Sequence, residues 1–162
     1  MDPKLPPDFV DLLTEFAASE VRYLVIGGYA VGFHDRPRAT KDLDLLVGGD
    51  AENVRRTCEA LDAFGVTSAI VEAFRAAADD EIVWFGVPPA RVDLLKSAGG
   101  IDFDAAYERR ARMVSAGMEV PVVAIDDLIT MKRAAGRDQD RVDVKRLERR
   151  QKQSAKLPPS TK

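Results

Sequence analysis

The feature that most constrains this chain is a short apolar run that carries two carboxylates, Asp42-Leu43-Asp44-Leu45. Successive side chains on a β-strand point to opposite faces, so Asp42 and Asp44 share one face, with Cα atoms about 6.5 Å apart. Leu43 and Leu45 then point to the other face, toward the core. Two like charges at that distance repel by about 2–3 kcal/mol at an effective dielectric constant of about 20. The run therefore predicts a strand whose charged face is stabilised by a bound cation.

A third aspartate, Asp93, lies in a second strand-like run, Arg91-Val92-Asp93-Leu94-Leu95. An earlier strand over 22–26 ends at Gly27-Gly28, directly before a short helix over 29–33. Glycines at such a turn let the backbone approach a ligand, and the N–H groups at the start of a helix favour phosphate. Carboxylates held side by side on strands suit a pair of divalent metal ions, whereas an aspartate pair on a surface loop serves only local hydrogen bonds.

Length and composition favour a soluble globular chain. It has 162 residues, of which 46% are hydrophobic and 31% charged, and we expect one domain over 1–152 with a disordered tail over 153–162. No apolar run approaches the roughly 20 residues that span a bilayer, and the N-terminus lacks a signal-peptide pattern, so we expect a cytoplasmic protein without a membrane partner. The single cysteine, Cys58, excludes an internal disulfide and is expected to be a packed helix residue.

The net charge of −3 hides an asymmetry along the chain. Residues 132–162 contain 11 Lys or Arg and 4 Asp or Glu, a net charge of +7. The preceding residues contain 13 basic and 23 acidic side chains, a net charge of −10. A basic C-terminal segment suits an anionic partner such as nucleic acid, and a solvated helix accounts for the same charges equally well.

Periodicity and turn residues predict helices and strands in a mixed order. We expect Asp8, Asp50 and Asp126 to cap helices that end near residues 17, 64 and 135, with Gly136 ending the last of them. Further helices are expected over 71–77, 102–109 and 138–152. Runs over 81–86 and 90–95, and over 113–115 and 119–123, predict two β-hairpins.

Two polar side chains fall on the apolar faces of the last two predicted helices. At 100° per residue, Lys132 lies within about 40° of Leu128, inside the apolar arc. Asp140 precedes Val144 and Leu147 at helical spacing, so it shares their face. A lysine and an aspartate that both point inward predict either a polar pocket or a buried structural ion pair.

Other catalytic systems find no support in the sequence. There is no Gly-x₄-Gly-Lys-Ser/Thr phosphate loop, no Gly-x-Ser-x-Gly elbow and no metal-spaced cluster of His or Cys. The only histidine, His34, lies in the segment that leads to the aspartate strand, and we expect it to form a hydrogen bond rather than to act as a metal ligand or base.

Three blocks together resemble the polymerase-β-like nucleotidyltransferase superfamily, close to the minimal nucleotidyltransferases and the AbiE-type toxins. The first runs from Gly27-Gly28-Tyr29-Ala30-Val31 to Thr40-Lys41-Asp42-Leu43-Asp44, and the second is Arg91-Val92-Asp93-Leu94-Leu95. The third, Asp127 to Asp143, is similar to that superfamily's C-terminal Lys…Arg-x-x-Asp-x-x-Asp motif. The resemblance implies an α+β fold, a mixed sheet flanked by helices with further helices at the C-terminus.

The resemblance also implies an activity. It is the transfer of a nucleoside monophosphate from an NTP such as ATP to a hydroxyl group, with Mg²⁺ or Mn²⁺ as cofactor and release of pyrophosphate. Asp42, Asp44 and Asp93 would hold the metal ions, and Asp93 would help to deprotonate the acceptor. Lys132 would complete the catalytic set by contacting the phosphates. Phosphoryl-type transfer depends mainly on such positioning and charge.

A set of nucleotide-binding residues follows from the same resemblance: Gly27, Gly28, Arg38, Thr40, Lys41, Lys132 and Asp140, the last of which would orient the lysine. Two positions depart from the family pattern. Tyr29 stands where many members have a phosphate-binding serine, which leaves that contact to backbone N–H groups. Asp35 stands where glycine is common. Neither departure removes a carboxylate of the predicted site.

Three functional hypotheses remain from the sequence. The first is an active nucleotidyltransferase with a macromolecular acceptor, tRNA or protein, in a toxin–antitoxin or defence system with a cognate toxin or antitoxin as partner. The second is a catalytically silent, antitoxin-like or regulatory binding module of the same fold. The third is a structural domain whose aspartates form only local hydrogen bonds.

Overall fold

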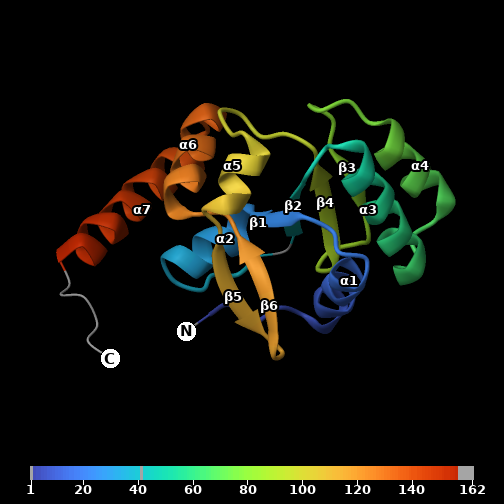
Figure 1. Cartoon of the computed structure of the whole chain (residues 1–162). Coiled ribbons are helices and arrows are strands. Elements are labelled where there is room, and N and C mark those ends of the chain that lie inside the picture. Colours follow the sequence, from blue (N-terminus) through green and yellow to red (C-terminus); the bar gives the residue numbers. More distant parts are fainter. Residues whose placement is uncertain (1, 41, 157–162) are drawn as a thin grey trace.

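The computed structural model describes residues 2–40 and 42–156. Over these residues the chain forms a six-stranded sheet in the order β3-β4-β2-β1-β6-β5 (Figure 1). β2 runs antiparallel to β1 and parallel to β4, and β6 runs parallel to β1, so the sheet is mixed. The strands are β1 (Tyr23–Ile26), β2 (Asp42–Val47), β3 (Val83–Phe85), β4 (Arg91–Leu95), β5 (Ala111–Ser115) and β6 (Met118–Val122).

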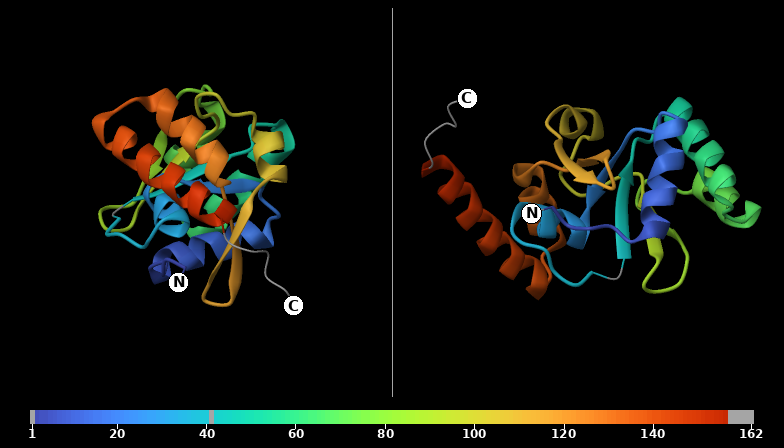
Figure 2. Two further views of the ribbon diagram at one scale, coloured as in Figure 1. Left: turned by 90° about the vertical axis from the view of Figure 1, so that its left-hand side faces the viewer. Right: turned by 90° about the horizontal axis from the view of Figure 1, so that it is seen from below.

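Helices lie on two sides of the strands. In the right-hand view of Figure 2, α1, α3 and α4 are on one side of β1 and β2, and α6 and α7 are on the other. The helices are α1 (Pro7–Ala18), α2 (Gly27–His34), α3 (Ala51–Phe64), α4 (Ser68–Ala76), α5 (Phe103–Glu108), α6 (Ile125–Ala135) and α7 (Asp138–Lys156). The predicted α+β architecture is confirmed. No helix of the described ranges is long and apolar enough to cross a membrane.

The alternation predicted for the aspartate strand is present in β2. Leu43 and Leu45 are fully buried, whereas Asp42 and Asp44 are only partly buried. β4 repeats the pattern, with Val92 and Leu94 buried. Because a strand exposes alternate residues to each face, one face of these strands belongs to the core and the other carries the carboxylates.

The first helix begins without the predicted cap. Asp8 lies in the first turn of α1, and Pro6 is the N-cap and makes no side-chain cap hydrogen bond. Pro7 occupies the first helical position, where its fixed φ fits and its missing N–H costs nothing. The apolar face was correctly predicted, since Phe9, Leu12, Leu13 and Phe16 are all buried.

The middle helices match the predictions closely. Asp50 caps α3 by accepting a hydrogen bond from the Asn53 amide at 2.8 Å, as predicted. Cys58 is buried within that helix, also as predicted. α4 starts three residues earlier than expected, at Ser68, because Val71 and Phe74 pack inward from its middle rather than from its start.

The two predicted hairpins are both confirmed as antiparallel strand pairs, β3 with β4 and β5 with β6. At the C-terminal end, α6 begins at Ile125 with Ala124 as N-cap, so the prediction that Asp126 caps this helix is wrong. Gly136 ends α6 in the left-handed conformation, as predicted. α7 extends to Lys156, beyond the expected end at 152, and the last residues of the predicted tail, 157–162, lie outside the described part of the chain.

Candidate active site

Three aspartates meet on the open face of two adjacent strands. Asp44 on β2 is the register partner of Asp93 on β4, and Asp42 precedes Asp44 on the same face. The pKa of Asp44 is raised to about 7, first by burial and then by the charges of Asp93 and Asp42 and a hydrogen bond with Asp93. The positive charge of Lys132 lowers this pKa to a smaller extent. We call Asp42, Asp44 and Asp93 the carboxylate row. The raised pKa of Asp44 thus reflects its burial first, and second the negative charge of its two neighbours, which the protein compensates incompletely.

Arg91, on β4, is a positively charged residue that contacts the carboxylate row. It is the register partner of Asp42 and donates a hydrogen bond from Nε to Asp93 Oδ1 at 2.8 Å. Its guanidinium also lies over the ring of Trp84, with Cζ 4.4 Å from the ring centroid. One arginine therefore faces three carboxylates, which leaves the row with an excess of negative charge.

The glycine turn makes room for the carboxylate row. Gly27 has a φ of +69°, and a Cβ atom there would lie 2.1 Å from Asp44 Oδ2. A Cβ on Gly28 would lie 2.8 Å from Thr40 Cγ2. Asp44 and Thr40 therefore leave no room for a side chain at these two positions. This requirement comes in addition to the predicted approach of a ligand.

Lys132 lies in a second charged group. It is 9% exposed, and its Nζ lies 3.2 Å from Asp140 Oδ1 and 3.1 Å from Asp143 Oδ2. Arg38 contacts Asp143 through two nitrogens at 2.9 and 3.3 Å, and Arg137 contacts Asp140 at 2.7 Å. We call these five residues the lysine cluster. The sequence predicted either a buried ion pair or a polar pocket around Lys132. The structure contains the ion pairs, and Lys132 and Asp140 also line a cleft.

Hydrogen bonds determine the protonation of the two buried aspartates in the lysine cluster. Burial by itself would raise the pKa of Asp140, but hydrogen bonds from Arg137 and Lys132 outweigh it and hold the pKa below the usual value. In the same way, hydrogen bonds from Arg38 and Lys132 overcome burial and lower the pKa of Asp143. Both aspartates are therefore charged at neutral pH and hold the lysine and the arginines in place.

The carboxylate row and the lysine cluster border one cleft of about 700 Å³. Six predicted residues line it: Gly27, Asp42, Asp44, Asp93, Lys132 and Asp140. Gly28 and Thr40 contact each other beside α2, and Arg38 reaches the cluster through Asp143. Lys41 lies outside the described residues. The segments that carry these residues are far apart in the sequence, so the fold brings most of the predicted site together.

The sequence of the chain matches a family model. Over residues 9–152 the chain fits the model described as "Nucleotidyltransferase of unknown function (DUF6036)". The chain belongs to this family. The prediction of a nucleotidyltransferase enzyme is confirmed at that level, and the narrower likeness to AbiE-type toxins stays a prediction. No curated protein sequence matches the chain.

Solved structures share the fold of this nucleotidyltransferase. The lincosamide antibiotic adenylyltransferase LnuA, in its lincomycin-bound form, is 12% identical with a TM-score of 0.55, covering 90% of this chain and 98% of that one. ANT(2")-Ia in complex with adenylyl-2"-tobramycin is 14% identical with a TM-score of 0.56, covering 91% of this chain and 92% of that one. At these identities the likeness establishes the fold alone.

The donor set of the nucleotidyltransferase suits a hard cation. Within 2–40 and 42–156, no group of three or more His, Cys, Asp or Glu side chains forms a ready-made metal cage, and Asp93 is turned toward Arg91. Mg²⁺ binds one or two carboxylates and completes its shell with waters and substrate phosphates. Oxygen ligands with excess negative charge, next to an open cleft, fit that mode of binding.

Several residues of this arrangement were not predicted as site residues. Asp143 is completely buried and binds both Lys132 and Arg38. Its position three residues after Asp140, on the same helix face, was a usable signal. Arg91 and Trp84 carried no comparable signal, because their contact depends on the pairing of β3 with β4. His34 donates a hydrogen bond from Nε2 to the Val123 carbonyl oxygen at 2.7 Å, consistent with the predicted role.

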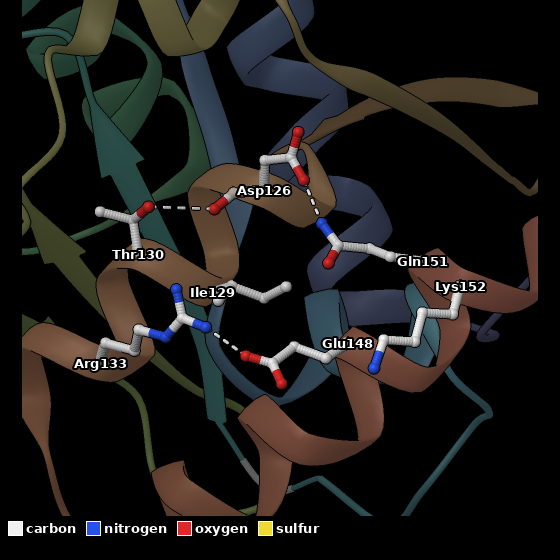
Figure 3. A pocket seen from close by; sticks show the side chains of 7 residues that line it. All are labelled: Asp126, Ile129, Thr130, Arg133, Glu148, Gln151 and Lys152. Carbon is white, nitrogen blue, oxygen red and sulfur yellow. Dashed lines mark hydrogen bonds and ion pairs between the residues drawn. The ribbon is translucent and has the colours of Figure 1, made fainter. Parts of the chain in front are cut away.

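A second hollow of the enzyme, of about 440 Å³, lies between α6 and α7 (Figure 3). Four of its polar side chains contact one another in pairs: Arg133 pairs with Glu148, and Gln151 donates a hydrogen bond to Asp126. It contains no excess of charge comparable to that of the carboxylate row. The cleft at the carboxylate row is therefore the candidate active site.

Proposed function

We propose that this nucleotidyltransferase transfers a nucleoside monophosphate from an NTP to an acceptor hydroxyl, at a Mg²⁺ or Mn²⁺ site formed by Asp42, Asp44 and Asp93. The observation that carries the proposal is the register of β2 with β4, which aligns Asp44 with Asp93 on the open face. Bound metal ions would neutralise charge on the transferred phosphoryl group and on the attacking oxygen. The raised pKa of Asp44 supports a cation at this position.

Each side chain has a distinct part in the proposed step. The acceptor oxygen forms a bond to the α-phosphorus while the bond to pyrophosphate breaks, in line with it. Asp93, at the outer end of the carboxylate row, receives the proton of the acceptor hydroxyl. Lys132 stabilises charge on the leaving phosphates, and Asp140 and Asp143 hold it in position at 3.2 and 3.1 Å.

The triphosphate lies, in this proposal, between the start of α2 and Lys132. The N-terminus of an α-helix offers backbone N–H groups to a phosphate, and Gly27 and Gly28 begin α2 beside Asp44. Thr40, Lys41 and Arg38 belong to the segment that follows. Arg38 is already ion-paired with Asp143, so its part in nucleotide binding uses its remaining N–H donors or acts through that aspartate.

We further propose a macromolecular acceptor, tRNA or a protein hydroxyl, and a role in a cytoplasmic toxin–antitoxin or defence system. The basic residues of α7 support an anionic acceptor. The two related structures contain lincomycin and adenylyl-tobramycin, and the chain covers almost all of each, so a small hydroxylated antibiotic is a second candidate acceptor. The catalytically silent binding module remains the alternative in which none of these acceptors is modified.

The test is transfer of label from each NTP, with Mg²⁺ present, to total tRNA, to cell lysate and to lincomycin or tobramycin. We expect label in one macromolecular fraction and none with the variant Asp42→Ala/Asp44→Ala. Transfer that survives the double substitution would overturn the site. NTP binding without transfer to any acceptor would favour the silent module. The melting temperature provides a check, because NTP with Mg²⁺ at about 100 times its dissociation constant adds roughly 2.7 kcal/mol of stability.

A further inference from the structure

An exposed aromatic ring lies directly beyond the carboxylate row. Trp84 on β3 is the register partner of Asp93 on β4, so the two side chains leave the same face of the sheet. Its neighbours Val83 and Phe85 point to the opposite face, where they pair with Leu94 and Val92 of the core. Trp84 is 52% exposed, so about half of this residue's surface is open to a ligand.

Arg91 holds this ring in place. The arginine Nε donates a hydrogen bond to Asp93 at 2.8 Å, and its guanidinium lies over the Trp84 ring at 4.4 Å. The guanidinium is thus anchored at one end by a carboxylate and stacked at the other on the indole. A planar cation and an indole held together in this way form a flat surface beside Asp93, which lines the cleft, and we call this pair the Trp84–Arg91 platform.

The order of residues across the sheet determines what this platform can contact. Strand register produces one row: Ile26, immediately before Gly27, pairs with Asp44, Asp44 pairs with Asp93, and Asp93 pairs with Trp84. In an in-line displacement the attacking and leaving oxygens lie on opposite sides of the phosphorus. With the pyrophosphate toward Gly27, the acceptor approaches from Asp93, and the next group beyond Asp93 is the platform.

We propose that the Trp84–Arg91 platform binds an unstacked nucleobase of a single-stranded nucleic-acid acceptor, next to the hydroxyl that is modified. The inference rests on the proposed function, since it depends on which end of the row takes the pyrophosphate. Aromatic rings and arginine planes are the surfaces on which single-stranded bases stack. Elsewhere on the protein, a hollow of about 240 Å³ between the end of α2 and α7 is lined by Arg36, Arg146, Arg149 and Arg150 together with Asp35, and its cations suit the phosphate backbone of a longer acceptor.

Binding can be measured directly, because Trp84 is the only tryptophan in the chain. The full chain with Mg²⁺ is titrated with a short oligoadenylate while tryptophan emission is recorded, first without NTP and then with a non-hydrolysable ATP analogue. We expect saturable quenching in both cases. An abasic oligomer of the same length has the same backbone charge without bases and should leave the emission unchanged.

Variants separate stacking from general attraction. Anisotropy of end-labelled oligoadenylate should show about 5- to 150-fold weaker binding for Trp84→Ala, the range measured for loss of one stacked base, and a much smaller loss for Trp84→Phe. The matched control is Val114→Ala on β5, which is 55% exposed at the other end of the sheet and should not alter affinity. Because these side chains are exposed, their replacement leaves the melting temperature almost unchanged.

Three results would overturn the platform. They are quenching by the abasic oligomer equal to that by oligoadenylate, unchanged affinity in Trp84→Ala, and quenching by a serine-rich peptide but not by oligoadenylate, which indicates a protein acceptor. ATP binding is followed separately by the Mg²⁺-dependent rise in melting temperature. If that rise is present in the wild type and absent in Asp42→Ala/Asp44→Ala while oligoadenylate fails to quench, the platform is wrong and the proposed function stands.

Discussion

Two groups of charged side chains line the same cleft and are built in opposite ways. The carboxylate row brings three acids together with one arginine, and the pKa of Asp44 rises to about 7. The lysine cluster combines two acids with three cations, and the pKa values of its aspartates fall below the usual range. In the first group the protein leaves negative charge that the proposed metal ion would neutralise. In the second group the charges complete one another.

This difference suits two different roles, the binding of a ligand by the carboxylate row and the positioning of Lys132 by the lysine cluster. A site for a metal and a triphosphate needs charge that is held on rigid strands and not yet neutralised, as on β2 and β4. A lysine that contacts phosphate must instead be held in a fixed orientation. Burying its ammonium group without acidic partners would lower the free energy of unfolding by several kcal/mol. Removal of one carboxylate should therefore have opposite effects on stability in the two groups.

The largest effect is expected for Asp44→Asn on catalysis. We expect transfer activity to fall by about 100- to 1000-fold, because the substitution removes a charged ligand of the proposed metal ion and weakens the stabilisation that the ion would give to the reacting phosphate. The free energy of unfolding should stay equal or rise, since like-charge repulsion is relieved. Label transfer and urea unfolding measure the two quantities. Asp104→Asn, an exposed control on α5, should leave activity unchanged, and a large loss of stability in Asp44→Asn would contradict the comparison.

The second effect is the loss of stability in Asp143→Ala. The substitution leaves Arg38 without its buried partner and Lys132 with Asp140 alone, and we expect the free energy of unfolding to fall by about 3 kcal/mol. Urea denaturation provides the measurement. On the same helix, Glu148→Ala removes an exposed pair with Arg133 and should cost less than about 1 kcal/mol. If both substitutions cost the same, the lysine cluster has no supporting role.

Much of this contrast could be predicted from the sequence, and particular residues explain why the rest could not. Alternation along β2 predicted which residues are buried, and helical spacing placed Lys132 and Asp140 inward. Both patterns are local. The alignment of Asp44 with Asp93 depends on the parallel pairing of strands some 50 residues apart in the chain. Periodicity fixes the face on which each side chain lies, but it does not say which strands are neighbours or which residues pair.

Errors at helix ends have a similar cause. The predicted caps Asp8 and Asp126 are typical capping residues, yet α1 starts at Pro7 and α6 at Ile125. In α6 the extra residues place Asp127 where it pairs with Arg109 at 2.8 Å, across from α5. A capping residue type alone does not decide which of two or three neighbouring residues begins a helix. The sequence identified the Gly27-Gly28 turn. Only the structure shows that Asp44 and Thr40 leave no room for a side chain at these two glycines.

The third effect is on the pH dependence of stability. The pKa of Asp44 rises from 3.8 to about 7 on folding, so the folded chain binds more protons between these values. The free energy of unfolding should therefore fall as the pH rises from about 4 to about 7, by about 2 kcal/mol once salt screening is included. Urea unfolding over this range tests the sign. The decline attributable to Asp44 should vanish in Asp44→Asn and persist in Asp104→Asn, and Mg²⁺ should reduce it in the wild type.

The smallest effect comes from the glycine that borders the carboxylate row. Gly27→Ala and Gly117→Ala both place a side chain at a positive φ, +69° and +75°, and each should cost about 1–2 kcal/mol of stability. Only at Gly27 would the new methyl group meet Asp44 Oδ2, at 2.1 Å, whereas no atom lies within 4 Å of it at Gly117.

We therefore expect Gly27→Ala to lower label transfer at least tenfold beyond Gly117→Ala, because a carboxylate displaced by about an ångström no longer holds the reacting groups in line. Equal activities in the two variants would mean that Asp44 tolerates displacement, and its position against α2 would then matter for packing alone. A loss of activity confined to Gly27→Ala would instead show that the glycine turn affects the reaction by keeping Asp44 in its position.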